Sequence, residues 1–372
     1  MDSQKLGFID AVRGIAILLV VLVHQSGAVA DVVPLSALGH QIGEYGHMGV
    51  QMFFVASALT LGLSYARRRT ENQALTRFYL RRLFRIAPMY WLAIGLYFVI
   101  ATVFIGNSDA FTPVNVAANA VFVHGFVPGA INDVVPGGWS IAGEMFFYSW
   151  FPAAFIAASW LYDRHGIWPL MVITGSIFGA YAAAWHLIPE FTVYQITRGN
   201  IFYYWAPAQI PVFLIGLTGY FAWRTWAPTN AAVNLAAFMT LTAATVLMWR
   251  SGYVAAFAWV PSIAALSFVF LLRGLSTLNR LPSWLQEVGR VSYSMYILHF
   301  IVVWFGAPIA ISWFAALVPV GDAVLLVTYP VTALVAFCMA WVSTRTIEAW
   351  GIAQGRKIIQ RMDRRRQALP AI

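Results

Sequence analysis

Two ionisable side chains in the first apolar segment have a spacing that could serve catalysis. Arg13 and His24 are eleven residues apart, so a helix places them on one face, about three turns or roughly 16 Å apart. A guanidinium group can hold phosphate or an oxyanion, and a neutral imidazole can remove the proton of a hydroxyl. The alternative interpretations are an arginine that snorkels to the membrane surface and a histidine that only hydrogen-bonds between helices. Asp10 lies close enough to pair with Arg13.

A second set of cations precedes the third apolar segment. Arg82 and Arg85 stand at positions i and i+3, so they face the same way on a helix, and their planar guanidinium groups suit phosphate. The other interpretation is a basic cluster that only keeps its loop on the cytoplasmic side of a membrane.

Further polar residues lie within apolar segments, where each ionisable group is by default a candidate for a functional site. Glu144 comes about one turn into the fourth segment and needs a partner such as a histidine or a sugar hydroxyl; alternatively it caps its own helix, with Ser140 as the N-cap. His299 lies two turns into the ninth segment, after Ser292, and the hydroxyls there could simply link helices. No His-x-x-x-His spacing occurs and Cys338 is the single cysteine, so we expect no metal and no intramolecular disulfide.

The elements that must position these residues are membrane helices. Of the 372 residues, 60% are hydrophobic and only 10% are charged, whereas soluble domains average about 45–50% and about 25%. About 20 apolar residues cross a bilayer. The sequence therefore predicts an all-α polytopic membrane protein with about ten transmembrane helices, at 8–30, 47–66, 83–105, 140–162, 167–188, 204–223, 231–249, 254–272, 292–315 and 322–346.

The short segment 114–127 decides the orientation of everything after it. If it is a re-entrant or interfacial helix on the outer side, every Lys and Arg except Arg198 and Arg250 falls on the cytoplasmic side, as the positive-inside rule favours. We therefore expect a protein of the cytoplasmic membrane with both termini in the cytoplasm, a membrane domain over 1–350 and a basic cytoplasmic tail over 351–372. The net charge of +9 then marks orientation and contact with membrane lipids, not nucleic-acid binding.

Taken together and in order, several of these pieces resemble the acyltransferase-3 family, whose members acylate bacterial surface polysaccharides, lipopolysaccharide and peptidoglycan. The resemblance covers nearly the whole chain and is carried by residues 9–16 with the Arg13-to-His24 spacing, 49–57, 82–90, 139–148 and 292–299. Gln51 stands where the family often has an acidic residue, and Ala58 where glycine is usual, so the acceptor could differ. No esterase-like domain follows the last apolar segment, and we expect the single-domain form.

The resemblance implies transfer of an acyl group, acetyl by default, from cytosolic acyl-CoA to a hydroxyl of an extracytoplasmic glycan or glycolipid. It implies roles for two groups of residues: Arg82 and Arg85 hold the donor's phosphates, and His299 with Ser292 lines the donor channel. In the chemistry, His24 is the general base, Glu144 orients that imidazole or a sugar hydroxyl, and Arg13 binds the pantetheine end or the developing oxyanion. A covalent acyl-enzyme through His24 or Ser57 stays open.

Two other classes of protein fit the composition. A transporter of a lipid-linked sugar or small amphiphile would also need many helices with buried polar groups, but no paired, broken half-helices are detectable in the sequence. A structural or regulatory membrane subunit gives no reason for the spacing of Arg13 and His24. The acyl chain, the acceptor and whether the chain forms a homo-oligomer are not specified by these residues.

Overall fold

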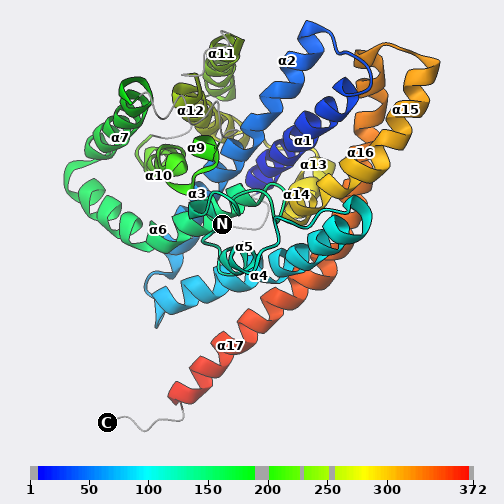
Figure 1. The fold of residues 1–372 in the computed structure, drawn as a ribbon. Helices are drawn as coiled ribbons and strands as arrows, with labels where there is room; N and C mark the ends of the chain where they lie inside the picture. Colours follow the sequence, from blue (N-terminus) through cyan, green and yellow to red (C-terminus); the bar gives the residue numbers. More distant parts are fainter. Residues whose placement is uncertain (1–6, 189–200, 227–229, 251–255, 368–372) are drawn as a thin grey trace.

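The computed structural model describes residues 7–188, 201–226, 230–250 and 256–367, and the regular secondary structure of these residues is helical (Figure 1). Within them, nine helical stretches are long and apolar enough to cross a membrane: Gly7–Ala30, Ala37–Arg68, Ala74–Ile105, Gly138–His165, Trp168–Leu187, Ala231–Trp249, Ala258–Ser276, Ser292–Leu317 and Gly321–Arg364. The prediction of an all-helical polytopic membrane protein is confirmed.

The described helices follow one another along the chain. They are α1 (Gly7–Ala30), α2 (Ala37–Tyr45), α3 (Gly49–Arg68), α4 (Ala74–Val99), α5 (Pro113–Ala120), α6 (Gly138–His165), α7 (Trp168–Leu187), α9 (Ile201–Tyr204), α10 (Ile210–Thr225), α11 (Ala231–Arg250), α12 (Ala256–Ser276), α13 (Ser283–Arg290), α14 (Ser292–Ile301), α15 (Ala307–Leu317), α16 (Gly321–Ser343) and α17 (Ala349–Gln367). π-Helical turns at Ile100–Ile105, Val302–Gly306 and Thr344–Glu348 extend α4, join α14 to α15 and join α16 to α17.

Two segments show where helix length decides the topology. The segment 114–127 forms only the eight-residue α5 and a 3₁₀ turn at His124–Phe126; eight residues rise about 12 Å, far short of a bilayer core of about 30 Å. The prediction that it does not span is confirmed.

The predicted span 204–223 is shorter than expected, because α10 has 16 residues and follows a 3₁₀ turn at Ala206–Gln209. Prolines at 207 and 211 lack the amide hydrogen that a continuous helix needs there.

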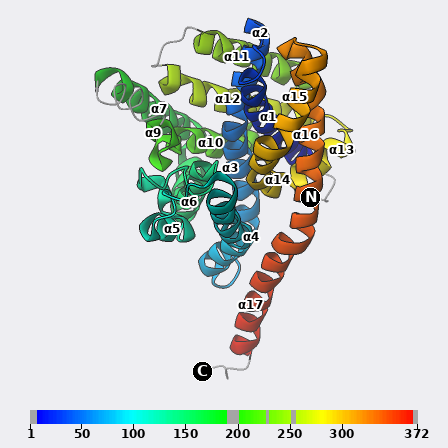
Figure 2. The ribbon, with the colours of Figure 1, turned by 45° about the vertical axis from the view of Figure 1, so that its right-hand side comes forward.

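Helix α1 lies in the middle of the bundle, where it packs against α3, α13, α14 and α16 (Figure 2). Its apolar residues Val12, Ala16, Ile17 and Val20 are buried in the main core. Because one apolar helix is enclosed by four others, a polar residue on α1 faces protein rather than lipid. The central place of α1 thus positions both Arg13 and His24 inside the bundle.

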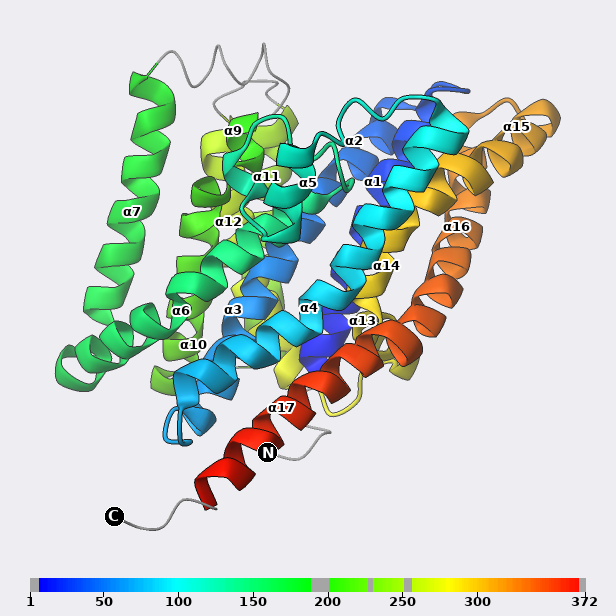
Figure 3. The same cartoon turned by 60° about the horizontal axis from the view of Figure 1, so that its bottom comes forward.

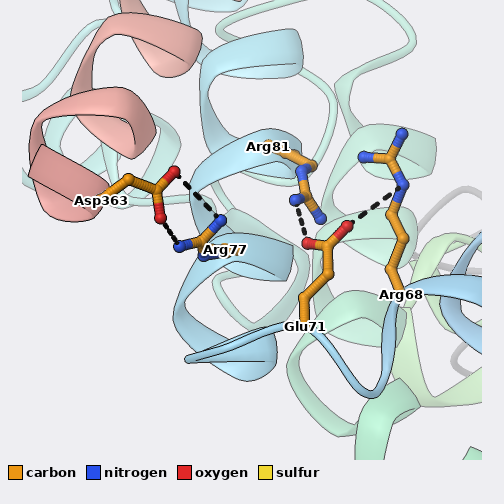
Figure 4. A network of polar contacts seen from close by, with 5 residues as sticks. All are labelled: Arg68, Glu71, Arg77, Arg81 and Asp363. Carbon is orange, nitrogen blue, oxygen red and sulfur yellow. Dashed lines mark hydrogen bonds and ion pairs between the residues drawn. The ribbon is translucent and has the colours of Figure 1, made fainter. Parts of the chain in front are cut away.

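The segment predicted as a basic tail is largely the helix α17, which crosses α4 at close range (Figure 3). Gly351 and Gly355 form a small-xxx-small pair at the crossing, a spacing that lets two helix backbones approach. A Cβ atom at Gly351 would lie 2.5 Å from Pro88 Cγ and 2.6 Å from the carbonyl oxygen of Phe84. Further along, Arg77 of α4 binds Asp363 of α17, beside the group that Glu71 makes with Arg81 and Arg68 (Figure 4).

Substituting Gly351 by alanine should weaken this crossing. Neither the Phe84 carbonyl nor the Pro88 ring can move freely, so we expect a loss of about 1–3 kcal/mol in unfolding free energy. Thermal unfolding in detergent measures it as a lower apparent melting temperature. Gly95→Ala on α4 is the matched control, since nothing lies within 4 Å of its added Cβ and alanine favours a helix by about 0.5–1 kcal/mol. Equal melting temperatures for the two variants would contradict the close crossing.

Candidate functional site

A narrow polar cavity of about 60 Å³ lies where α1, α3, α4, α6 and α14 meet. Each of these helices contributes at least one polar side chain to its wall: Arg13, Ser57, Arg82, Arg85, Glu144, Tyr148, Ser292 and Tyr296, beside the apolar Val50, Phe53 and Phe54. Three guanidinium groups around one carboxylate give this cavity a net positive charge, which favours an anionic ligand.

Glu144 is the centre of the hydrogen bonds in the cavity. Its Oε1 accepts a hydrogen bond of 2.5 Å from Ser57 Oγ and a second one from the hydroxyl of Tyr148, one helical turn further along α6. Its partners in the chain are thus two hydroxyls and not a histidine, and a sugar hydroxyl as a further partner stays a prediction. The alternative N-cap at Ser140 is wrong, because α6 begins at Gly138 after Gly137 at positive φ.

The arginines approach this carboxylate from two helices. Arg82 lies over the rings of Phe78 and Tyr148, at 5.9 and 5.8 Å from their centroids, and its Nε is buried without a hydrogen-bond partner in the described part of the chain. Arg13 reaches Thr60 Oγ1 at 3.4 Å. A buried donor that lacks a partner is costly, so Arg82 is suited to receive an acceptor atom from a ligand.

The predicted ion pair between Asp10 and Arg13 is not formed. Asp10 instead lies 3.6 Å from Nε of Arg290, which belongs to α13. Helix α13 packs along the start of α1, and this neighbour could not be read from the spacing of residues within α1. Arg13 therefore keeps its charge available to the cavity.

His24 and His299 lie outside the lining of this cavity and contact each other. Their ring centroids are 5.2 Å apart, and Phe300 packs on both rings, at 4.4 Å from His24 and 4.1 Å from His299. His299 Nδ1 is 2.7 Å from the carbonyl oxygen of Tyr296. A carbonyl can only accept, so Nδ1 carries the hydrogen and the buried Nε2, which has no partner among the described residues, carries the lone pair.

Tyr296 connects the two groups. Its ring lines the cavity, its carbonyl binds His299, and its hydroxyl forms hydrogen bonds with Ser140 and with the carbonyl of Gly137. The structure therefore brings together Arg13, Arg82, Arg85, Glu144 and Ser292 in one place and pairs His24 with His299 in another. Glu144 has no contact with His24; its partners are Ser57 and Tyr148.

Three tyrosines of the site, the buried Tyr148 and Tyr296 and the half-buried Tyr293, are not among the predicted site residues. Tyr148 stands four residues after Glu144 and Tyr296 three before His299, so helical spacing was a signal that could have found them. Tyr293 donates a hydrogen bond of 2.7 Å to the carbonyl of Ile86 and thereby ties α14 to α4 beside Arg85. Together they fix the helices that carry the charged groups.

The short segment α5 and its 3₁₀ turn support the start of α6. His124 Nε2 is 2.9 Å from the carbonyl of Gly138 and 3.0 Å from the hydroxyl of Tyr90, which donates to Asn119 Oδ1 at 2.7 Å. Burial lowers the pKa of His124 to about 4, so this imidazole is neutral near pH 7. We interpret this group as a positioning element for α6 and Glu144.

Comparisons with known proteins identify the family of this chain. The model of the acyltransferase domain family matches residues 6–345. The chain is also similar to the exopolysaccharide production protein ExoZ of Rhizobium meliloti (strain 1021), with 28% identity over 176 residues, 46% of this chain and 55% of ExoZ, so the match spans about half of that relative. No solved structure matches. Because the family model matches nearly its whole length, the chain belongs to the acyltransferase-3 family of membrane proteins.

Proposed function

We propose that this protein is an O-acyltransferase of the cytoplasmic membrane, which moves a short acyl group, acetyl by default, from cytosolic acyl-CoA to a hydroxyl of an extracytoplasmic glycan or glycolipid. The observation that carries the proposal is the convergence of Arg13, Arg82 and Arg85 on the Glu144 cavity in a chain of this family. The relative's role in exopolysaccharide production supports a glycan acceptor.

The distribution of Lys and Arg along the chain supports an orientation of the protein in the membrane. With both termini in the cytoplasm, Arg82 and Arg85 near the start of α4 lie toward the cytoplasmic side, where acyl-CoA is found. His24, three turns beyond Arg13 on α1, then lies toward the outer side. The long pantetheine arm is suited to carry the thioester from the cavity to the histidine pair.

In the proposed reaction, the acceptor hydroxyl attacks the carbonyl carbon of the thioester. His24 takes the hydroxyl proton as the new C–O bond forms, and Arg13, about three turns away in the cavity, binds the pantetheine arm of the donor. When the C–S bond breaks, the proton passes from the imidazole to the thiolate, and free CoA leaves. Because Glu144 is bound to Ser57 and Tyr148 and not to His24, its proposed role is to hold these hydroxyls and balance the arginines of the cavity.

The test compares envelope glycans from cells with and without this protein by mass spectrometry. We expect an added acyl mass, that of one acetyl group for each ester, only in cells that have the protein. Unchanged glycans, together with no consumption of acyl-CoA by the purified protein, would contradict the proposal and favour the transporter.

Arg85→Ala should mainly weaken binding of the donor. A lost charge-assisted hydrogen bond is worth about 1.5–3 kcal/mol, so we expect the KM for acyl-CoA to rise about tenfold or more while kcat changes little. Arg81→Ala is the matched control, because Arg81 lies one turn earlier on α4, binds Glu71 and does not line the cavity. Equal KM values for the Arg85 variant and the wild type would show that Arg85 does not bind the donor.

A further inference from the structure

A second, larger cavity adjoins the first at Arg85. Its volume is about 340 Å³, within the range of about 300–1,000 Å³ that is typical of small-molecule sites. It is lined by three arginines from three helices, Arg85 of α4, Arg290 of α13 and Arg356 of α17, with Glu348 as its carboxylate. Because Arg85 lines both cavities, a ligand could extend from one into the other.

The carboxylate of the second cavity does not neutralise its arginines. Glu348 is buried and accepts hydrogen bonds from the hydroxyls of Ser294 and Thr344. Arg290 is paired with Asp10 and Glu287. Arg85 and Arg356, by contrast, make no ion pair with a carboxylate of the described residues. Two guanidinium groups are therefore available for an anion, and their geometry suits phosphate oxygens.

The position of Arg356 is set by the close crossing of α17 and α4. Gly355, the residue before it, lies against Phe84, the residue before Arg85: an added Cβ would be 2.9 Å from Phe84 Cβ. The contact at Gly351 and the ion pair of Arg77 with Asp363 hold α17 on either side of this point (Figure 4 shows the ion pair). Arg356 is thus held at the cavity although its side chain is exposed to solvent.

We infer that the second cavity binds the phosphorylated nucleotide end of the acyl-CoA donor, with Arg85 on the diphosphate at the junction and Arg356 on the 3′-phosphate. This inference rests on the proposed function. It makes α17 part of the donor site and leaves the first cavity to the pantetheine arm. Anionic lipid headgroups carry phosphate as well, and the experiment must separate the two sources.

The experiment measures KM for acetyl-CoA and for acetyl-3′-dephospho-CoA with the full-length protein in vesicles of phosphatidylcholine. For the wild type, we expect the KM of the dephospho donor to be about tenfold higher, the effect of one lost charged contact. Arg356→Ala should raise the KM for acetyl-CoA by a similar factor and leave the KM for the dephospho donor unchanged. Lys357→Ala is the matched control: it is exposed on the same helix and does not line the cavity, so both KM values should stay.

A binding measurement keeps this inference apart from the proposed function. Calorimetric titration with adenosine 3′,5′-bisphosphate should show binding to the wild type and about tenfold weaker binding to Arg356→Ala. If the wild type transfers acetyl but does not discriminate between the two donors, the inference is wrong and the proposed function stands. If it binds the bisphosphate but transfers nothing, the proposed function is wrong and the phosphate site stands.

The lipid alternative has its own result. Vesicles containing phosphatidylglycerol should leave the ratio of the two KM values unchanged if the cavity holds the nucleotide. If the two KM values become equal in vesicles with phosphatidylglycerol, and the bisphosphate does not bind, the cavity belongs to a lipid headgroup and the inference is wrong.

Discussion

Replacing His24 by alanine is expected to reduce acyl transfer by about 10²–10⁴-fold, the range that a general base contributes. His24→Gln should lose as much, because an amide keeps the size and hydrogen bonding but cannot take up a proton. The measurement is release of free CoA and label transfer from acetyl-CoA by purified protein. Membrane insertion and melting temperature should stay near those of the wild type, since His24 is only half-buried and contacts His299 and Phe300 through its ring.

The control and the contradicting result come from other histidines. His165→Ala, at the exposed end of α6, should leave activity unchanged. His299→Gln tests the neighbouring ring, whose Nε2 has no partner among the described residues and carries the lone pair of a base. Full activity of His24→Ala combined with loss in His299→Gln would assign the base to His299 and contradict the proposed role of His24.

Replacing Arg13 by alanine should raise the KM for acyl-CoA by about tenfold or more, because Arg13 lies in the cavity, about three turns from His24, and one lost charge-assisted hydrogen bond to the donor is worth about 1.5–3 kcal/mol. As with Arg85→Ala, kcat should change much less, because an interaction made equally with the bound donor and in the transition state affects KM. Arg13→Lys should restore only part of the donor affinity, since an ammonium group lacks the two-pronged geometry of guanidinium.

Thr60 supplies a control for Arg13. Its hydroxyl accepts a hydrogen bond from Arg13 at 3.4 Å, a long distance for a hydrogen bond. Thr60→Val keeps the shape and removes this contact together with the hydrogen bond that Thr60 donates to the carbonyl of Ala56, so the KM for the donor should rise by less than tenfold, about 1 kcal/mol. If Arg13→Ala lowered kcat and left KM unchanged, Arg13 would act in the chemical step and not in donor binding.

The fold was largely predictable from the sequence, because hydropathy and helix length alone determine which segments cross a bilayer. The segment 114–127 was recognised as too short and too polar to span, and it forms the eight-residue α5. Helix α10 begins at Ile210, six residues later than the apolar segment 204–223 predicts, because Pro207 and Pro211 are compatible with a helix only in its first turn. The tail 351–372 was read as basic, and the glycine pair that packs α17 on α4 was overlooked.

The candidate site was predictable only within single helices. The spacing of Arg82 and Arg85 put both on the cavity side of α4, and the chemistry of Glu144 required a buried partner. The identity of that partner, Ser57, comes from another helix, and so does the contact of His24 with His299. Such pairs depend on how α1, α3, α6 and α14 cross, which no periodicity within one segment contains.

The most direct measurement is sided acyl transfer in proteoliposomes. Labelled acetyl-CoA is supplied on the side that carries the C-terminus, and a glycan acceptor on the other. The proposed function predicts that label reaches the glycan with the wild-type protein and not with His24→Ala. Label that stays in acetyl-CoA with the wild type, while the acceptor or donor itself crosses the membrane, would contradict it.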